Sequence, residues 1–200
     1  ALKTPLSVLS NAANAPEKRD DDLARLVTSQ VDTVRKQVDY HLSRAQAAAS
    51  VQVPGMRTSV EPVIQGLVRV MQRVHAERHL VFVVIPDEAS LSFRGEEQDL
   101  QEMLGNLIDN ASKWARSRIE IQVSDESGKL RVSIDDDGKG IAETERDHVL
   151  KRGVRADEQV PGTGLGLAIT ADLAQMYGGD LVLAKSSLGG LQASLILPAV

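Results

Sequence analysis

The chain of 200 residues contains no cysteine, and only 2% of its residues are aromatic. The absence of cysteine excludes disulfide bonds, thiolate metal sites and cysteine nucleophiles, and it is consistent with a reducing compartment such as the cytoplasm. With so few aromatic residues, the core must be built from Leu, Val, Ile and Ala. That composition suits helices packed on a sheet better than an aromatic-rich β-sandwich, so it favours an α+β fold.

Long hydrophobic runs are also missing. The longest apolar stretches, such as LVFVVI at residues 80–85, fall far short of the ~20 residues that cross a bilayer, and no signal-peptide pattern opens the sequence. The net charge of −5 argues against general binding to nucleic acid or acidic membranes, but it allows a local basic site for an anionic ligand. The sequence therefore predicts a soluble protein segment.

Glycine and proline are absent from residues 20–50, where apolar residues recur at steps of three and four. This spacing predicts one long helix, preceded by a shorter helix over residues 4–15 and a polar turn at 16–22. Two helices with narrow apolar stripes cannot close a core alone, so we expect a helical hairpin that pairs with a second copy as a dimeric four-helix bundle. A hairpin packed on its own C-terminal domain is the alternative.

The pattern changes after a Pro- and Gly-containing linker at residues 51–62. Helices are expected over residues 62–77, 95–115 and 164–178. Strands are expected over 79–86, 118–125, 129–135, 180–186 and 191–198, the second and third joined by the turn ESGK. This order indicates a mixed sheet covered by helices. It disfavours a dinucleotide-binding Rossmann fold, because GTGLGL precedes a helix without following a strand.

Polar side chains line one face of the helix predicted over residues 95–115. Glu102, Asn106, Asn110 and Lys113 lie at steps of four, four and three, which places them together. The opposite side carries the expected core residues Leu100, Met103, Leu104, Leu107, Ile108 and Ala111. Amide oxygens are suitable ligands for Mg²⁺, and a lysine can neutralise phosphate charge. A solvated helix face is the alternative.

The stretch DDDGKGI, residues 135–141, places aspartates at the end of a predicted strand and glycines just after it. Strand alternation points Asp136 inward, away from its two acidic neighbours. A carboxylate at the mouth of an apolar pocket is a suitable acceptor for an exocyclic amine such as that of adenine. Gly138 and Gly140 would let a flat ligand approach the backbone, with Ile141 against its ring. An ordinary turn after a strand is the alternative.

The stretch GTGLGL, residues 162–167, opens the next helix, where backbone N–H groups can bind phosphate. Before it lies a long, polar, poorly periodic segment, expected as a loop, in which Lys151, Arg152 and Arg155 cluster. A loop of this length and charge is typical of a lid over a polyphosphate. A solvated surface loop is the alternative.

In this order and spacing, EMLGNLIDNASK, DDDGKGI and GTGLGL resemble the N, G1 and G2 boxes of the GHKL ATPase superfamily, and more narrowly the catalytic domain of sensor histidine kinases. LKTPL at residues 2–6 resembles the end of their H box. The resemblance implies a dimerisation and histidine phosphotransfer hairpin at residues 1–50, a linker at 51–58 and a Bergerat-fold ATP-binding domain, an α/β sandwich, at 59–200. It also implies the cytoplasmic portion of an inner-membrane sensor.

The resemblance also implies residue roles. Asn106 would coordinate Mg²⁺, with Glu102 acting through water, and Asn110 and Lys113 would contact phosphates. Asp136 would accept the adenine amine. The remaining implied nucleotide contacts are Gly138, Gly140, Ile141, Gly162, Thr163, Gly164, Leu165 and Gly166. Arg152 and Arg155 form an RGxR pattern that resembles the lid of PhoQ-type sensor kinases and would reach the γ-phosphate. Thr4 would orient water for dephosphorylation of a response regulator.

The implied reaction is γ-phosphoryl transfer from Mg·ATP to a histidine and then to a response-regulator aspartate. The alignment of LKTPL with the H box puts the expected phosphoacceptor immediately before residue 1, and none of the four histidines fits the H box. Ala1 occupies its acidic position, and no Phe marks an F box. Two alternatives stay open: another GHKL ATPase, with Glu102 as general base for water, or a non-catalytic nucleotide-binding scaffold.

Overall fold

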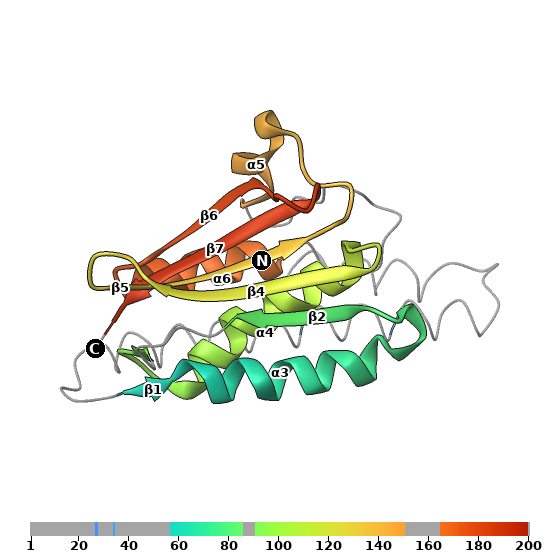
Figure 1. Ribbon diagram of the computed structural model, residues 1–200. Helices are drawn as coiled ribbons and strands as arrows, with labels where there is room; N and C mark the ends of the chain where they lie inside the picture. Colours follow the sequence, from blue (N-terminus) through green and yellow to red (C-terminus); the bar gives the residue numbers. More distant parts are fainter. Residues whose placement is uncertain (1–26, 28–33, 35–56, 86–90, 151–164, 200) are drawn as a thin grey trace. The chain divides into compact units, whose positions relative to one another are not determined.

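The computed structural model describes Val27, Val34 and residues 57–85, 91–150 and 165–199 (Figure 1). The chain divides into two compact units, Ala1–Gln46 and Ala47–Val200. The predicted N-terminal hairpin lies outside the described residues, apart from Val27 and Val34, which are both helical. Among the described residues, no helix has the length and apolar character needed to span a membrane.

A five-stranded mixed sheet forms one layer of the second unit (Figure 1). Its strands, in spatial order, are β2 (Val81–Ile85), β4 (Arg118–Asp125), β5 (Lys129–Asp136), β7 (Leu191–Pro198) and β6 (Asp180–Lys185). The β2–β4 pair is parallel and the other three pairs are antiparallel. The predicted strands and the predicted mixed sheet are therefore confirmed.

The turn between β4 and β5 explains why these strands pair in a fixed register. Ser127 and Gly128 both have positive φ, 58° and 80°, and Glu126 and Lys129 exchange two backbone hydrogen bonds. Two successive residues with positive φ make a turn whose twist matches that of the flanking strands. The register that follows puts Ile119 opposite Asp136.

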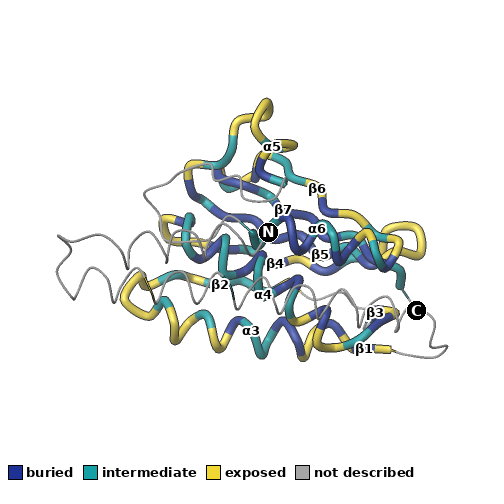
Figure 2. The backbone as a smooth tube through the Cα atoms, turned by 180° about the vertical axis from the view of Figure 1, so that it is seen from behind, coloured by how far each residue is buried: buried dark blue, intermediate teal, exposed yellow. Residues whose placement is uncertain are grey.

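Three helices pack beside the sheet: α3 (Val60–Val74), α4 (Glu97–Trp114) and α6 (Gly166–Met176). Helix α4 contacts β5, and α6 contacts β6 and β7; because α4 and α6 also contact each other, they cover the same face. Helix α3 packs on α4 through the buried residues Val60, Val63, Ile64 and Val68. Burial is concentrated between the helices and the sheet, and the outer side of α3 is exposed (Figure 2).

Helix α4 forms the middle of this core, as its apolar spacing predicts. All six residues expected on its buried side are at most 3% exposed. Acidic Glu97 and Asp99 lie in its first turn and basic Lys113 in its last, which complements the helix dipole.

A buried aromatic cluster joins the first turn of α4 to the end of α6. The Tyr177 hydroxyl donates to Asp99, and its ring meets Phe93 edge to face with centroids 4.9 Å apart. A Cβ on Gly95 would lie 2.3 Å from the Phe93 ring, so only glycine fits there. Burial raises the pKa of Asp99, and the Tyr177 hydrogen bond opposes that shift.

Some predicted boundaries are wrong. The linker was expected to reach Pro62, but β1 (Thr58–Ser59) pairs with β3 (Ser92–Phe93) and α3 begins at Val60. Proline is tolerated in a first helical turn, so its presence there did not mark a break. The segment expected as one long loop contains α5 (Glu143–Val149), whose sole buried residue is Val149. A helix that buries so little has no apolar periodicity to detect.

Candidate nucleotide site

Asp136, at the end of β5, is a buried carboxylate held by the backbone. It is 2% exposed, and its Oδ1 accepts hydrogen bonds from the amides of Gly138 at 2.8 Å and Leu191 at 3.2 Å. Burial raises the pKa of this carboxyl, and the two amide hydrogen bonds oppose the rise. Both hydrogen bonds reach the same oxygen, so they fix the orientation of the carboxyl group from one side.

Glycines are required around Asp136 because the backbone approaches it closely. A Cβ on Gly138 would lie 2.4 Å from the carbonyl oxygen of Trp114, and one on Gly190 would lie 2.1 Å from Asp136 Oδ1. Gly140 has φ 67°, a conformation that side chains disfavour. The sequence-based prediction of this site missed Gly190, although its position directly before a predicted strand was a usable signal.

The two neighbouring aspartates have other partners, as strand alternation predicts. Asp135 accepts from Gln192 Nε2 on the adjacent strand β7. Asp137 accepts from the backbone amides of Arg116 and Ser117 and from the Ser117 hydroxyl. Although burial alone would raise it, these hydrogen bonds lower the pKa of Asp137 to about 2. Both neighbours are thus engaged by the protein, and Asp136 remains the aspartate predicted to face a ligand.

The predicted polar face of α4 is present, and its four residues Glu102, Asn106, Asn110 and Lys113 are all half-buried. Asn106 Nδ2 is buried without a hydrogen-bond partner, alone in this respect among the side-chain atoms that the structure describes. A buried amide atom left unpaired costs about 1–3 kcal/mol. Because the two ends of an amide exchange by a rotation of 180°, either end can be offered to a ligand.

Helix α6 begins beside this face. A Cβ on Gly166 would lie 3.5 Å from Asn106 Oδ1, so the start of the helix opened by GTGLGL adjoins the middle of α4. The end of α4 meets the Asp136 loop, where the Trp114 carbonyl lies against Gly138. The structure thus brings together the Asp136 loop, the polar face of α4 and the N-terminus of α6.

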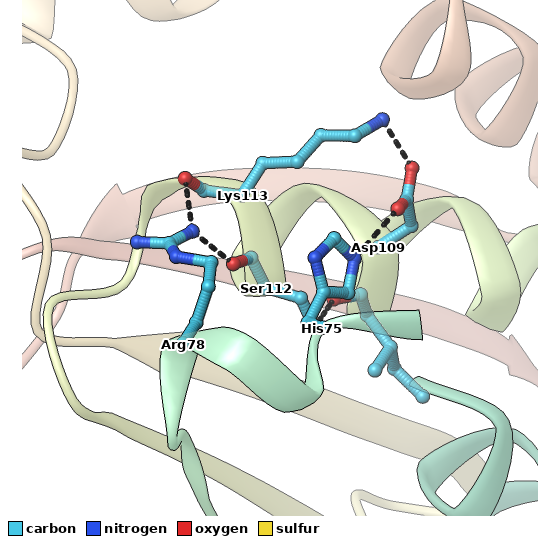
Figure 3. A network of polar contacts seen from close by, with 6 residues as sticks. His75, Arg78, Asp109, Ser112 and Lys113 are labelled. Carbon is cyan, nitrogen blue, oxygen red and sulfur yellow. Dashed lines mark hydrogen bonds and ion pairs between the residues drawn. The ribbon is translucent and has the colours of Figure 1, made fainter. Parts of the chain in front are cut away.

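Two polar residues near this face, Asp109 and His75, were missed. Asp109 pairs with Lys113 and also with His75, which comes from the end of α3 (Figure 3). Asp109 lies four residues before Lys113 and seven after Glu102, so helical spacing could have placed it on the polar face. No sequence pattern linked His75 to it.

Several predicted site residues lie outside the described residues: Thr4, Lys151, Arg152, Arg155, Gly162, Thr163 and Gly164. Of the predicted contacts inside the described ranges, Leu165 is half-buried and precedes the first turn of α6, and Ile141 is half-buried after Gly140.

The donor set of this site fits a purine nucleotide with a hard metal ion. A buried carboxylate can accept from an exocyclic amine, and a hydrogen bond to a charged group is worth about 1.5–3 kcal/mol. The amides and carboxylate on α4 supply oxygen ligands, of which Mg²⁺ needs only a few from protein. The adjoining helix N-terminus and Lys113 suit phosphate oxygens.

Residues 95–200 match the family described as histidine kinase-, DNA gyrase B-, and HSP90-like ATPase. The chain is 38% identical over 199 residues to the sensor protein kinase CarS of Pseudomonas aeruginosa, covering 99% of this chain and 44% of that protein. It is 30% identical over 200 residues to the virulence sensor histidine kinase PhoQ of Salmonella typhimurium, covering 98% and 41%. The chain thus spans less than half the length of these relatives.

Solved structures show the same fold. The mycobacterial sensor histidine kinase MprB superposes with a TM-score of 0.65 at 26% identity, covering 72% of this chain and 97% of that one. Full-length ShkA in complex with AMPPNP superposes with a TM-score of 0.71 at 22% identity, covering 99% and 43%. The family match covers more than half of the chain, and the arrangement of the site is consistent with it. The chain belongs to the histidine kinase-, DNA gyrase B- and HSP90-like ATPase family.

Proposed function

We propose that this chain is the catalytic core of a sensor histidine kinase, which binds Mg·ATP and transfers the γ-phosphoryl group to a histidine and then to a response-regulator aspartate. The family match to residues 95–200 and the relatives named as sensor kinases support this function. The observation that carries it is Asp136, a buried carboxylate whose Oδ1 is already held by two backbone amides.

Asp136 is proposed to recognise adenine. Its Oδ2 would accept the exocyclic amine, while the bonds from Gly138 and Leu191 keep the carboxyl group from rotating. Gly140 and Ile141 would lie along the ring, because the loop that follows Asp136 carries no bulky side chain before Ile141 except Lys139. The Lys139 ammonium lies over the Trp114 ring, 4.6 Å from its centroid, which holds that side chain beside the end of α4.

The polar face of α4 is proposed to hold the metal and the phosphates. Asn106, whose amide is incompletely paired, would ligate Mg²⁺ together with Glu102 through water, and Asn110 and Lys113 would contact phosphate oxygens. The metal would neutralise charge on the transferred phosphoryl group. Gly166 leaves the space beside Asn106 free of a side chain, so the N–H groups at the start of α6 can approach the same phosphates.

The remaining roles rest on the resemblance in the sequence. Arg152 and Arg155 would close over the γ-phosphate beside Gly162, Thr163, Gly164 and Leu165, and Thr4 would orient water for dephosphorylation. Residues 1–50 would form the dimerisation hairpin, with a response-regulator receiver domain as partner. The resemblance also implies the cytoplasmic portion of an inner-membrane sensor, and the relatives are named as sensors.

A labelling experiment tests the kinase reaction. The full-length protein is incubated with Mg·ATP labelled at the γ-phosphate, and the protein is then treated with acid or base. Label that is stable to base and lost in acid is the result we expect, because phosphohistidine has that stability. Rapid release of phosphate without labelling would instead support another ATPase of the family, and nucleotide binding without either outcome would support a scaffold.

A further inference from the structure

Residues at the end of α3 and in the short 3₁₀ helix η1 (Ala76–Arg78) form polar contacts with the C-terminal end of α4 (Figure 3). The Arg78 guanidinium donates to the carbonyl oxygens of Ser112, Lys113 and Ala115 at 2.5–2.6 Å. Ser112 and Lys113 lie in the last turn of α4 and Ala115 is its C-cap, and the carbonyls at the end of a helix lack partners within it. Arg78 therefore fixes the backbone of Lys113.

The side chain of Lys113 is also held in place at this end of α4. Asp109 Oδ2 lies 2.5 Å from Lys113 Nζ, and Asp109 Oδ1 lies 3.3 Å from His75 Nε2. The His75 side chain is only 14% exposed, whereas those of Asp109 and Lys113 are about one-third exposed. Both oxygens of the carboxylate are thus used, one by the lysine and one by a partner from another helix.

We propose that Asp109, oriented by His75, is a positioning residue that holds the Lys113 ammonium ready for the phosphates of a bound nucleotide. This inference rests on the proposed function, which places phosphates on the polar face of α4. An ammonium has three donors, so Lys113 can keep its bond to Asp109 and still donate to phosphate. A free lysine loses rotamer entropy when it binds, and a lysine that is already ordered loses less.

The arrangement differs from an ordinary i,i+4 pair on a helix surface. In such a pair both side chains move freely, and the contribution to stability is small. Here His75 restrains the Asp109 carboxylate and Arg78 restrains the backbone of Lys113, so both the backbone and the ammonium end of the lysine are held in place. The rival interpretation is that Asp109 competes with phosphate for the lysine. Removal of the carboxylate would then tighten nucleotide binding.

The test compares the affinities of the whole chain for Mg·ATP and for adenosine, measured by displacement of a fluorescent nucleotide. Asp109→Asn keeps the shape of the side chain and removes its charge. Positioning predicts a loss of ATP affinity of about three- to tenfold. This range is expected if the released Lys113 side chain must lose roughly 1 kcal/mol of rotamer entropy when it binds phosphate. Adenosine affinity should not change, because adenosine has no phosphate.

A double-mutant cycle with Lys113→Met shows whether Asp109 acts through the lysine. We expect Asp109→Asn to have no further effect on ATP affinity once Lys113 is replaced, and His75→Ala to weaken ATP in the same sense as Asp109→Asn. Glu126→Gln is the matched control, since it removes one carboxylate from an ion pair with Arg131 at the β4–β5 turn. It should leave both affinities unchanged.

The outcomes separate this inference from the proposed function. If the wild-type chain binds ATP and Asp109→Asn leaves its affinity unchanged or increases it, the positioning role is wrong and the nucleotide site stands. An equal loss in the Lys113→Met background would also overturn the role. If the wild-type chain binds no nucleotide, the proposed function fails and this inference fails with it. Melting temperatures of all variants identify any that lose their fold.

Discussion

Replacement of Asp136 by Asn separates recognition of adenine from stability of the fold. Asn has the same shape, and its Oδ1 can accept the same hydrogen bonds from the Gly138 and Leu191 amides. Those two bonds fix which end of the amide faces the protein. The Nδ2 group would then take the place of Oδ2 and present a donor to the adenine amine, which is also a donor.

The substitution should affect the stability of the fold and the binding of nucleotide in opposite directions. Burial raises the pKa of Asp136, so the folded protein favours the neutral form of this side chain. Asp136→Asn should therefore leave the free energy of unfolding at neutral pH equal or higher. Binding loses a charged hydrogen bond and leaves two donors facing each other, which together cost about 3 kcal/mol or more, or at least about 100-fold in affinity.

Calorimetric titration with Mg·ATP and denaturation by urea measure these two quantities. Asp135→Asn is the matched control, because Asp135 is also buried but contacts Gln192 on the neighbouring strand, and ATP affinity should be retained. Unchanged ATP affinity in Asp136→Asn would refute the assignment of this residue to adenine. A large loss of stability would refute the argument that its buried charge is a cost to the fold.

Three further predictions follow from the same geometry. ATP affinity of the wild-type chain, measured over a pH series, should fall as the pH is lowered through the raised pKa of Asp136, because the protonated carboxyl is a weaker acceptor. The contribution of Asp136 to the free energy of unfolding should instead fall as the pH rises from the unfolded-state pKa to the folded-state pKa. An affinity that stays constant over that range would contradict the first claim. Asn106→Ala should not lower the unfolding free energy by more than about 1 kcal/mol, because removal of the unpaired, buried Nδ2 offsets the packing that is lost. The same substitution should remove the Mg²⁺-dependent part of ATP affinity in titrations with and without the ion, and retention of that part would exclude Asn106 as a ligand. Tyr177→Phe should lower the unfolding free energy in urea by about 1–3 kcal/mol, because Asp99 stays buried without the hydroxyl that donates to it, and an unchanged value would show that water replaces the hydroxyl.

Helix α4 could be predicted from the sequence because its periodicity fixes both of its faces. The apolar residues at steps of three and four identify the buried side, and the polar row that includes Asn106 and Lys113 then follows from helical geometry. The β4–β5 hairpin was equally predictable, since its turn residues and its alternation point to one register. Local rules were sufficient wherever the partners are close in the chain.

The partners that complete the site could not be predicted in this way. Leu191 donates to Asp136 across 55 positions of the chain, and His75 meets Asp109 across 34. Such contacts depend on how β7 and α3 pack, which periodicity does not encode. Helix α5 was missed for a related reason, because it buries only Val149 and leaves the rest of its surface polar.

The central claim is that a nucleotide binds between the Asp136 loop, the polar face of α4 and the start of α6. Backbone amide chemical shifts, followed by heteronuclear NMR while Mg·ATP is added, test this claim most directly. We predict the largest changes at the Gly138 and Leu191 amides, which donate to Asp136, and at Gly166 beside Asn106. Saturable binding that leaves these amides unshifted and perturbs a different surface would contradict the account.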